Sequence, residues 1–250
     1  MPQANELIVQ ALEEAGIEYV FGIPGGGTGQ IFGLLHGKEE TIKTILCRHE
    51  QTAAIMADVY GRATGKPAAI MGQGLFMGSN ASFGIMEAML SSSPMVILTD
   101  TSDGGSAQHP ANQSGAGEYG SIDLPSIFKA MTKYTTLATT PKEAVIGTQL
   151  AIKHSLSGRP GPACVVMRSS SIGGEVDVES PPFIHSTTGY LNTAKPQSAP
   201  QDIEKAIEIL REAKKPILVA GNGVHLSKSH TQLQQLAELW DMPVATSYKG

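Results

Sequence analysis

One acidic residue, Glu50, follows a short apolar strand pattern at residues 41–46 and precedes a helical pattern of small residues at 51–64. Ligands of an open parallel sheet bind at the carboxyl ends of its strands. Apolar walls from the small residues would partly desolvate a carboxyl group there and suit it to exchange protons. A solvated first-turn glutamate, stabilised by the helix macrodipole, has the same pattern, and the spacing alone favours this second interpretation.

Two glycine-rich turns follow two other strand patterns. Residues 24–27 end the apolar run 19–23, and residues 73–80 follow the run 68–71. Glycine there permits positive φ and close approach of the backbone to a ligand, although a plain tight turn explains the first segment equally well. For the second, Ser79 or Asn80 as a helix N-cap is the favoured interpretation. Neither turn has the GxGxxG or GK[ST] spacing of a nucleotide loop.

The histidines have no spacing typical of catalysis or metal binding. The chain lacks HExxH and GxSxG motifs, so no metal site and no serine nucleophile are predicted. His109 lies with Gln113 in a polar, glycine-rich segment at residues 100–120 that has no periodicity. A segment of this length between periodic elements is usually functional or mobile.

The elements that must position these residues alternate between strand and helix patterns over residues 1–170. Continuous apolar strands between helices indicate an α/β fold, with a doubly wound, mostly parallel sheet flanked by helices. Residues 171–198 are rich in Ser, Gly, Thr and Pro and are predicted to be a linker. Residues 199–250 begin a new alternation, which predicts the N-terminal part of a second α/β, Rossmann-like domain that is too short to bury a core alone.

The composition excludes several classes of protein. The 250 residues are 41% hydrophobic and carry a formal net charge of −5. This apolar share excludes a disordered chain, and the charge disfavours binding to nucleic acid or to a membrane surface. Cys47 and Cys164 lack CxxC spacing, and no apolar run reaches the ~18 residues that cross a bilayer. We therefore expect a cytoplasmic protein without a signal peptide.

Several segments, taken in chain order, resemble the N-terminal half of thiamine-diphosphate-dependent enzymes. The similar group contains acetolactate synthase, benzaldehyde lyase and 2-oxo acid decarboxylases. The resemblance implies the thiamine-diphosphate-binding fold and the first part of the central domain, and it favours a functional Glu50. The segments are ELIVQALEEAGIEYVFGIPGGG, CRHEQ with AAIMADVYGRATGKPA, SSSPMVILTD, SGRPGPACVVM and KKPILVAGNGVHLSKS with LAELWDMPVATSYKG.

The resemblance implies a role for each matching residue. In the family, the glutamate equivalent to Glu50 hydrogen-bonds N1′ of the cofactor's aminopyrimidine, whose exocyclic nitrogen then deprotonates the thiazolium C2. That carbon attacks the carbonyl group of a 2-oxo acid or an aldehyde. Glu50 is thus the expected catalytic residue. The expected cofactor-binding residues are Pro24, Gly25, Gly26, Glu50, Gln73 and Asn80.

Three departures from the family pattern concern the substrate and the metal. The usual Gly-Pro-Gly of the second turn is Leu75-Phe76-Met77 here, which would reshape the pyrimidine or donor pocket. A substrate-contacting glutamine is missing unless Gln113 replaces it. The GDG…N motif for Mg²⁺ and the diphosphate is absent, so those ligands are expected outside this segment; FAD, possible in the family, has no indication here. The candidate substrate residues are Phe76, His109 and Gln113.

Three functions stay open. The favoured one is the N-terminal portion of a longer enzyme, a transferase or lyase that acts as an acetolactate-synthase-like carboligase or a decarboxylase. Its site would be shared between the subunits of a homodimer or homotetramer. The second is a separate subunit of a split enzyme. The third is a non-catalytic, degenerate member with a role in assembly, which the Leu75-Phe76-Met77 departure favours.

Overall fold

Six short segments of the first part of the chain pair edge to edge through their backbone groups, and the central strands among them are apolar and buried on both faces. Each neighbouring pair is parallel, and the strand order is β2-β1-β3-β4-β6-β5. The predicted doubly wound α/β fold is therefore confirmed. The strands are β1 (Tyr19–Gly22), β2 (Lys43–Leu46), β3 (Ala68–Gly72), β4 (Met95–Thr101), β5 (Tyr134–Ala138) and β6 (Pro162–Arg168).

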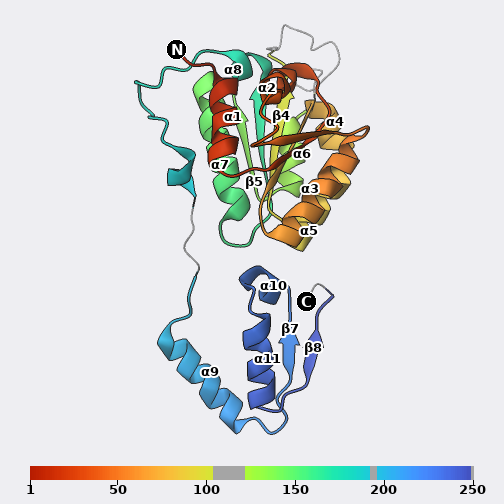
Figure 1. Cartoon of the computed structure of the whole chain (residues 1–250), viewed down its shortest axis with the longest axis vertical. Coiled ribbons are helices and arrows are strands. Elements are labelled where there is room, and N and C mark those ends of the chain that lie inside the picture. The colour runs from red at the N-terminus through yellow and green to blue at the C-terminus, as the bar shows by residue number, and fades with distance from the viewer. Residues whose placement is uncertain (104–121, 192–195, 249–250) are drawn as a thin grey trace. The chain divides into compact units, whose positions relative to one another are not determined.

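The computed structural model describes residues 1–103, 122–191 and 196–248. The chain divides into two units, Met1–Asn192 and Thr193–Gly250 (Figure 1). The predicted substrate residues His109 and Gln113 lie outside the described residues. Phe76 is thus the one candidate substrate residue that lies among the described residues.

Helices cover both faces of the sheet. Two separate apolar clusters join the sheet to its helices: one contains residues of α1, α2, α7 and α8, and the other contains residues of α3, α4, α5 and α6. In β4, Val96 and Leu98 face the first cluster, whereas Met95 and Ile97 face the second. The helices are α1 (Ala4–Glu14), α2 (Gly29–Leu35), α3 (Glu50–Thr64), α4 (Gly74–Ser79), α5 (Ser82–Ser91), α6 (Leu124–Met131), α7 (Pro141–Leu156) and α8 (Ser169–Gly173), with short 3-10 turns η1 (Gly26–Thr28) and η2 (Thr187–Tyr190).

The sequence patterns missed several elements of this unit. The half-buried edge strand β5 has the sequence YTTLA, which is not a continuous apolar run, and α6 precedes it in the same unassigned region. The segment 73–80, predicted to be a turn, contains the short helix α4, and the helix predicted to begin at Ser79 or Asn80 begins at Ser82 as α5. The break between them matters for the site, since Asn80 lies in it.

The first part of the predicted linker packs onto the sheet unit. Ile172 and Val176 are buried in its core, and the backbone N–H of Val176 donates to the carbonyl oxygen of Pro2 at 2.9 Å. Further along, the Gln149 side chain of α7 donates to the carbonyl oxygen of His185 at 2.7 Å. The expectation of a linker beginning at residue 171 therefore needs correction, because long-range contacts hold residues 171–191 although their composition is typical of a connection.

The second unit is small and largely open. Its strands β7 and β8 pair in parallel. Ala220 and Met242 are its buried apolar residues among those described, while Ile203 and Leu236 of its helices stay 50% and 38% exposed. Its elements are α9 (Pro200–Glu212), β7 (Leu218–Ala220), α10 (Gly223–Ser227), α11 (His230–Leu239) and β8 (Val244–Thr246).

None of the helices in the described part of the chain is both long enough and apolar enough to cross a bilayer.

Candidate functional site

The carboxyl ends of four neighbouring strands bring distant turns together. Because the strands are parallel, the turns that follow β1, β2, β3 and β4 leave the same edge of the sheet. The register pairs Gly22 with both Leu46 and Met71, and pairs Gly72 with Thr99. Each of these positions precedes a segment with a predicted site residue or a polar side chain.

Glu50 is the first residue of α3 and is only 7% exposed. The N-cap His49 accepts a hydrogen bond at Nδ1 from the backbone N–H of Gln51 over 3.2 Å, which fixes the start of the helix. Ala53 and Ala54 of the next turn are fully buried. The interpretation that spacing alone favoured, a solvated first-turn glutamate, is thus wrong, because the packing of α3 removes the side chain from water.

Small residues allow the close packing that buries this helix end. A Cβ atom added to Gly84 of α5 would lie 2.5 Å from the Cβ atom of Ala54 in α3. A larger side chain at Gly84 or at Ala54 would push the two helices apart. The run of small residues noted in the sequence therefore serves the approach of α5 to the helix that carries Glu50.

Asn80 binds Glu50 directly. Its side-chain Nδ2 donates to Oε2 of Glu50 at 2.9 Å. Asn80 ends α4, and its backbone N–H donates to the carbonyl oxygen of Phe76 at 2.8 Å. The N-cap of α5 is Ala81, so the prediction that Ser79 or Asn80 caps this helix is wrong. The break between α4 and α5 leaves the amide of Asn80 available to the carboxylate.

The first glycine turn lies beside Gln73. A Cβ atom added to Gly25 would stand 3.5 Å from Oε1 of Gln73, so the glutamine side chain lies along this turn. Thr28 Oγ1 donates to the carbonyl oxygen of Gly25 at 2.6 Å and closes the turn. Gly26 has φ +55°, a left-handed conformation that favours glycine. The structure thus brings Pro24, Gly25 and Gly26 next to the turn after β3.

Sequence reasoning missed Asp100, which connects these turns. It lies in the last part of β4, is 4% exposed, and accepts hydrogen bonds from the backbone N–H groups of Gly27 (2.5 Å) and Gly74 (3.0 Å). Burial raises the pKa of its carboxyl group, although the two backbone N–H groups act in the opposite direction. A carboxylate at the end of an otherwise apolar strand was the available signal.

The three bulky residues that replace the family's Gly-Pro-Gly have different surroundings. Met77 is fully buried, and a Cβ atom added to Gly72 would lie 3.0 Å from its sulfur atom. Leu75 is half-buried, whereas Phe76 is 41% exposed. Met77 therefore contributes to the core, and Phe76 offers an aromatic ring at the surface of α4. A contact of Phe76 with substrate stays a prediction.

Other reactive groups near this edge are less suited to catalysis. Cys47 follows β2 and is half-buried, and burial raises the pKa of its thiol, which disfavours the nucleophilic thiolate. No group of three or more His, Cys, Asp or Glu side chains in residues 1–103, 122–191 and 196–248 is arranged to hold a metal ion. Glu50 and Asp100 are thus the buried carboxylates to consider at this edge.

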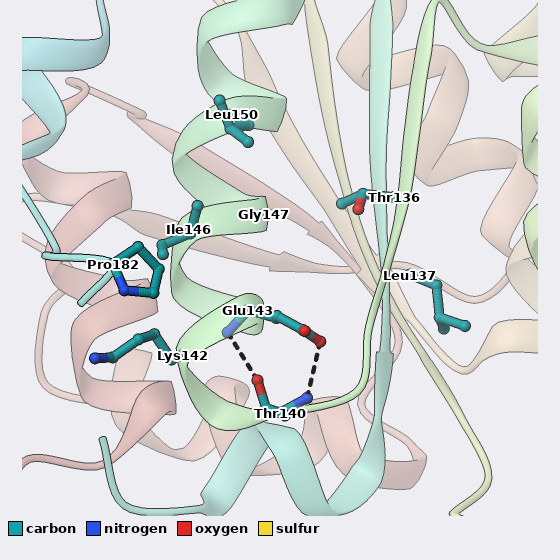
Figure 2. Close-up of a pocket in the computed structure, with 9 residues that line it drawn as sticks. All are labelled: Thr136, Leu137, Thr140, Lys142, Glu143, Ile146, Gly147, Leu150 and Pro182. Carbon is teal, nitrogen blue, oxygen red and sulfur yellow. Dashed lines mark hydrogen bonds between the residues drawn. The ribbon is translucent and has the colours of Figure 1, made fainter. Parts of the chain in front are cut away.

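A pocket in the described part of the chain lies elsewhere. It lies between α7, the edge strand β5 and Pro182 (Figure 2), and its volume is about 420 Å³. Its carboxylate, Glu143, is engaged in the N-terminal cap of α7 with Thr140, and the N–H groups of the preceding residues, Thr139 first, lower its pKa. None of the predicted site residues lines this pocket. The predicted site is an open sheet edge rather than this pocket.

Comparison with known proteins gives two family matches. Residues 2–118 match the model described as "Thiamine pyrophosphate enzyme, N-terminal TPP binding domain", and residues 203–250 match "Thiamine pyrophosphate enzyme, central domain". The first match covers the turns that carry Glu50, Asn80 and Asp100.

Individual relatives agree with these matches. The chain is 31% identical over 249 residues to the probable acetolactate synthase large subunit of Methanocaldococcus jannaschii, covering 98% of this chain and 40% of the relative. It is 32% identical over 249 residues to the acetolactate synthase large subunit of Haemophilus influenzae, covering 98% of this chain and 41% of the relative. The chain thus spans about two fifths of the length of these curated relatives.

Proposed function

The chain belongs to the thiamine pyrophosphate enzyme superfamily, and from this membership we propose that its first unit binds the aminopyrimidine half of thiamine diphosphate at the sheet edge that carries Glu50. The observation that carries the proposal is the pair formed by the buried Glu50 and the half-buried Asn80, joined over 2.9 Å. Among the described residues, only Oε2 of this carboxylate receives a donor, which leaves Oε1 for a ligand.

The side chains at the edge fit an aminopyrimidine. A ring nitrogen of that group needs a carboxyl group with which to share a proton, and Glu50 is the buried carboxylate with an oxygen left for it. Gly25 and Gly26 allow the neighbouring turn to pack closely against Gln73 and Asp100, and this turn follows β1, the strand beside β2, which precedes Glu50. Thiamine diphosphate, when bound, supplies the electron sink for making or breaking a carbon–carbon bond next to a carbonyl group.

The residues of this chain have distinct proposed tasks. Glu50 holds a proton at N1′ of the aminopyrimidine, and partial exclusion of water by Ala53 and Ala54 strengthens that hydrogen bond. Asn80 orients the carboxylate by holding Oε2. Pro24, Gly25, Gly26 and Gln73 line the approach to the ring. We propose that the ligands for Mg²⁺ and the diphosphate come from outside this segment.

For the whole protein we propose an acetolactate-synthase-like carboligase that takes a 2-oxo acid as donor. The names of the relatives support this choice over a decarboxylase or lyase. A separate subunit of a split enzyme would use Glu50 in the same way. The non-catalytic alternative is the weaker one, because a degenerate site would not need a buried carboxylate held by a specific amide partner.

We also propose that the protein is an oligomer whose subunits meet over α3 and α5. These two helices lie side by side on one face of the sheet (Figure 1). Their outer apolar side chains stay exposed, and the same helix α3 begins with Glu50, so a second subunit seated there would reach the site. We call this surface the α3–α5 face; it consists of Met56 (36% exposed), Val59 (53%), Phe83 (56%), Met86 (46%) and Leu90 (65%).

The direct experiment uses the full-length protein with thiamine diphosphate, Mg²⁺ and pyruvate. Calorimetry measures cofactor binding, and NMR identifies the product. Acetolactate would support the carboligase, acetaldehyde would favour a decarboxylase, and absence of cofactor binding would contradict the proposal as a whole. A requirement for a second polypeptide would favour the split enzyme.

A further inference from the structure

A single buried carboxylate holds two separate turns at the edge of the sheet. Oδ2 of Asp100 accepts from the backbone N–H of Gly27, and Oδ1 accepts from the backbone N–H of Gly74. Gly27 belongs to the turn after β1, and Gly74 opens α4 after β3. The sequence separations of 73 and 26 residues make these bonds tertiary contacts, not local caps.

Local side chains do not perform this task. Gly25 at the N-cap of η1 and Gln73 at the N-cap of α4 make no side-chain capping hydrogen bond within the described part of the chain. The first N–H groups of a helix need an acceptor when they are buried. Asp100 supplies one acceptor to each of the two elements, so both turns depend on the same side chain.

The turn after β1 is fitted closely around this carboxylate. A Cβ atom added to Gly26 would lie 2.0 Å from Oδ2 of Asp100, and the φ of +55° at Gly26 is already unfavourable for other residues. The conformation of the backbone at Gly25 and Gly26 therefore depends on where the carboxylate of Asp100 lies. Burial of a carboxylate costs free energy, as the raised pKa of Asp100 indicates. This cost favours a role for Asp100 that a neutral residue would not perform.

The second hydrogen bond reaches Glu50 through α4. Gly74 is the first residue of this helix, and Asn80 follows its last residue, Ser79. Met77 anchors the middle of the helix in the core. Asn80 then donates to Glu50 at 2.9 Å. A shift at the start of so short a helix would move Asn80 away from the carboxylate that it holds.

We propose that Asp100 is a positioning residue, which holds the turn of Pro24–Gly26 and the start of α4 in the arrangement that the aminopyrimidine site requires. The part of this inference that concerns the cofactor rests on the proposed function. The hydrogen-bonded link between the two turns does not, so each part has its own measurement.

The first measurement is amide hydrogen–deuterium exchange of the full-length protein without ligand. In Asp100→Asn, which keeps the size of the side chain but offers one oxygen instead of two, we expect peptides spanning residues 23–30 and 72–80 to exchange faster. Loss of a charge-assisted bond predicts about a 10-fold change at the affected amide. Asp103→Asn is the matched control, because this exposed carboxylate accepts from Ser170 and from neither turn. Unchanged exchange in both peptides would overturn the link.

The second measurement concerns the cofactor. We expect Asp100→Asn to raise the KM for thiamine diphosphate about 10-fold and to slow the proton exchange at C2 of the bound cofactor, with unfolding temperature and circular dichroism confirming the fold. Faster amide exchange with unchanged cofactor binding and C2 exchange would mean that Asp100 is structural only, and the positioning role would be overturned. Glu50→Gln separates the two hypotheses: it should impair C2 exchange without changing the amide pattern. If Glu50→Gln has no effect on the cofactor, the proposed function fails and the positioning role fails with it, while the amide measurement still decides the link.

Discussion

Asn80 donates a hydrogen bond to the buried carboxylate of Glu50 over 2.9 Å, and this bond joins the end of α4 to the first residue of α3. The two residues come from turns that follow different strands, β3 and β2. Their contact depends on the break between α4 and α5. Because of this break, Asn80 binds Glu50 instead of capping α5, which is the role that its sequence context suggested. The first two predictions concern this pair.

Replacing Glu50 by glutamine should disable the cofactor site while preserving the fold. The amide cannot hold an acidic proton at N1′, and loss of a positioned proton-transfer group costs about 10²–10⁴-fold in rate. Turnover and C2 proton exchange of bound thiamine diphosphate measure this effect. Glu40→Gln, at an exposed glutamate, is the control that should change neither quantity. Wild-type activity in Glu50→Gln would remove this residue from the mechanism.

Replacing Asn80 should weaken the site less than replacing Glu50 does. Asn80→Ala removes one hydrogen bond to a charged group, worth about 1.5–3 kcal/mol, so activity should fall roughly 10- to 100-fold. Asn80→Asp should be worse, since a second carboxylate would face Glu50. Steady-state rates at saturating cofactor provide the comparison. Ser79→Ala, which removes a bond to the carbonyl oxygen of Leu75 instead, should stay near wild type, and an equal loss there would point to α4 rather than to the pair.

Asp100 should make the protein less stable as the pH rises. Burial raises the pKa of its carboxyl group above the ordinary value, so between the two values the folded state keeps a proton that the unfolded state has lost. This contribution is present in full below the unfolded pKa and is lost as the pH rises through the folded pKa. Unfolding measured at a series of acidic to neutral pH values should show a smaller fall for Asp100→Asn than for the wild type.

Glu143 is the control for that pH series, because its pKa is shifted in the opposite direction. N–H groups at the start of α7, Thr139 first, lower the pKa of Glu143, so its stabilisation is present above the unfolded pKa and is lost as the pH falls through the lowered value. Glu143→Gln should therefore lose stability at neutral pH and converge with the wild type in acid. If both variants changed the profile in the same direction, the assignment of the Asp100 effect to burial would be wrong.

Gly26→Ala should destabilise the first unit, whereas Gly33→Ala should not. At Gly26 the φ is +55° and the new methyl group would collide with Asp100 Oδ2 at 2.0 Å, so we expect a loss of about 1–3 kcal/mol in the free energy of unfolding. Gly33 lies inside α2 with no atom within 4 Å of an added Cβ, and alanine there should stabilise by about 0.5–1 kcal/mol. Denaturant titrations of both variants test this contrast, and equal effects would contradict it.

Polar residues on the α3–α5 face should weaken assembly. Phe83 and Leu90 are 56% and 65% exposed in the single chain, and burying such side chains gives about 1.5–3 kcal/mol each. Phe83→Ser with Leu90→Ser should therefore shift the full-length protein toward smaller species in light scattering after gel filtration. Phe183→Ser, at a phenylalanine that is 54% exposed outside this face, is the control. An unchanged assembly in the double variant would place the interface elsewhere.

Local patterns predicted the parts of the fold whose residues carry the signal themselves. The continuous apolar runs of β3, β4 and β6 are buried along nearly their whole length, so composition alone marks them. The edge strand β5 escaped because one of its sides lacks a neighbour and its threonines need no apolar surroundings. Residues 171–191 were assigned to a linker from their composition. The contacts that hold them, such as that of Val176 with Pro2, join distant parts of the chain and leave no local pattern.

The sequence by itself determined the fold class, the buried strands with most of the helices between them, and the choice of Glu50 as the candidate residue, because periodicity and family motifs are properties of neighbouring residues. Only the tertiary structure decided that Glu50 is buried, that Asn80 is its partner rather than a helix cap, and that Asp100 links two turns. The physical reason is that burial and hydrogen bonds between segments 26 to 73 residues apart arise from the parallel register of the strands, which brings their carboxyl ends to one edge.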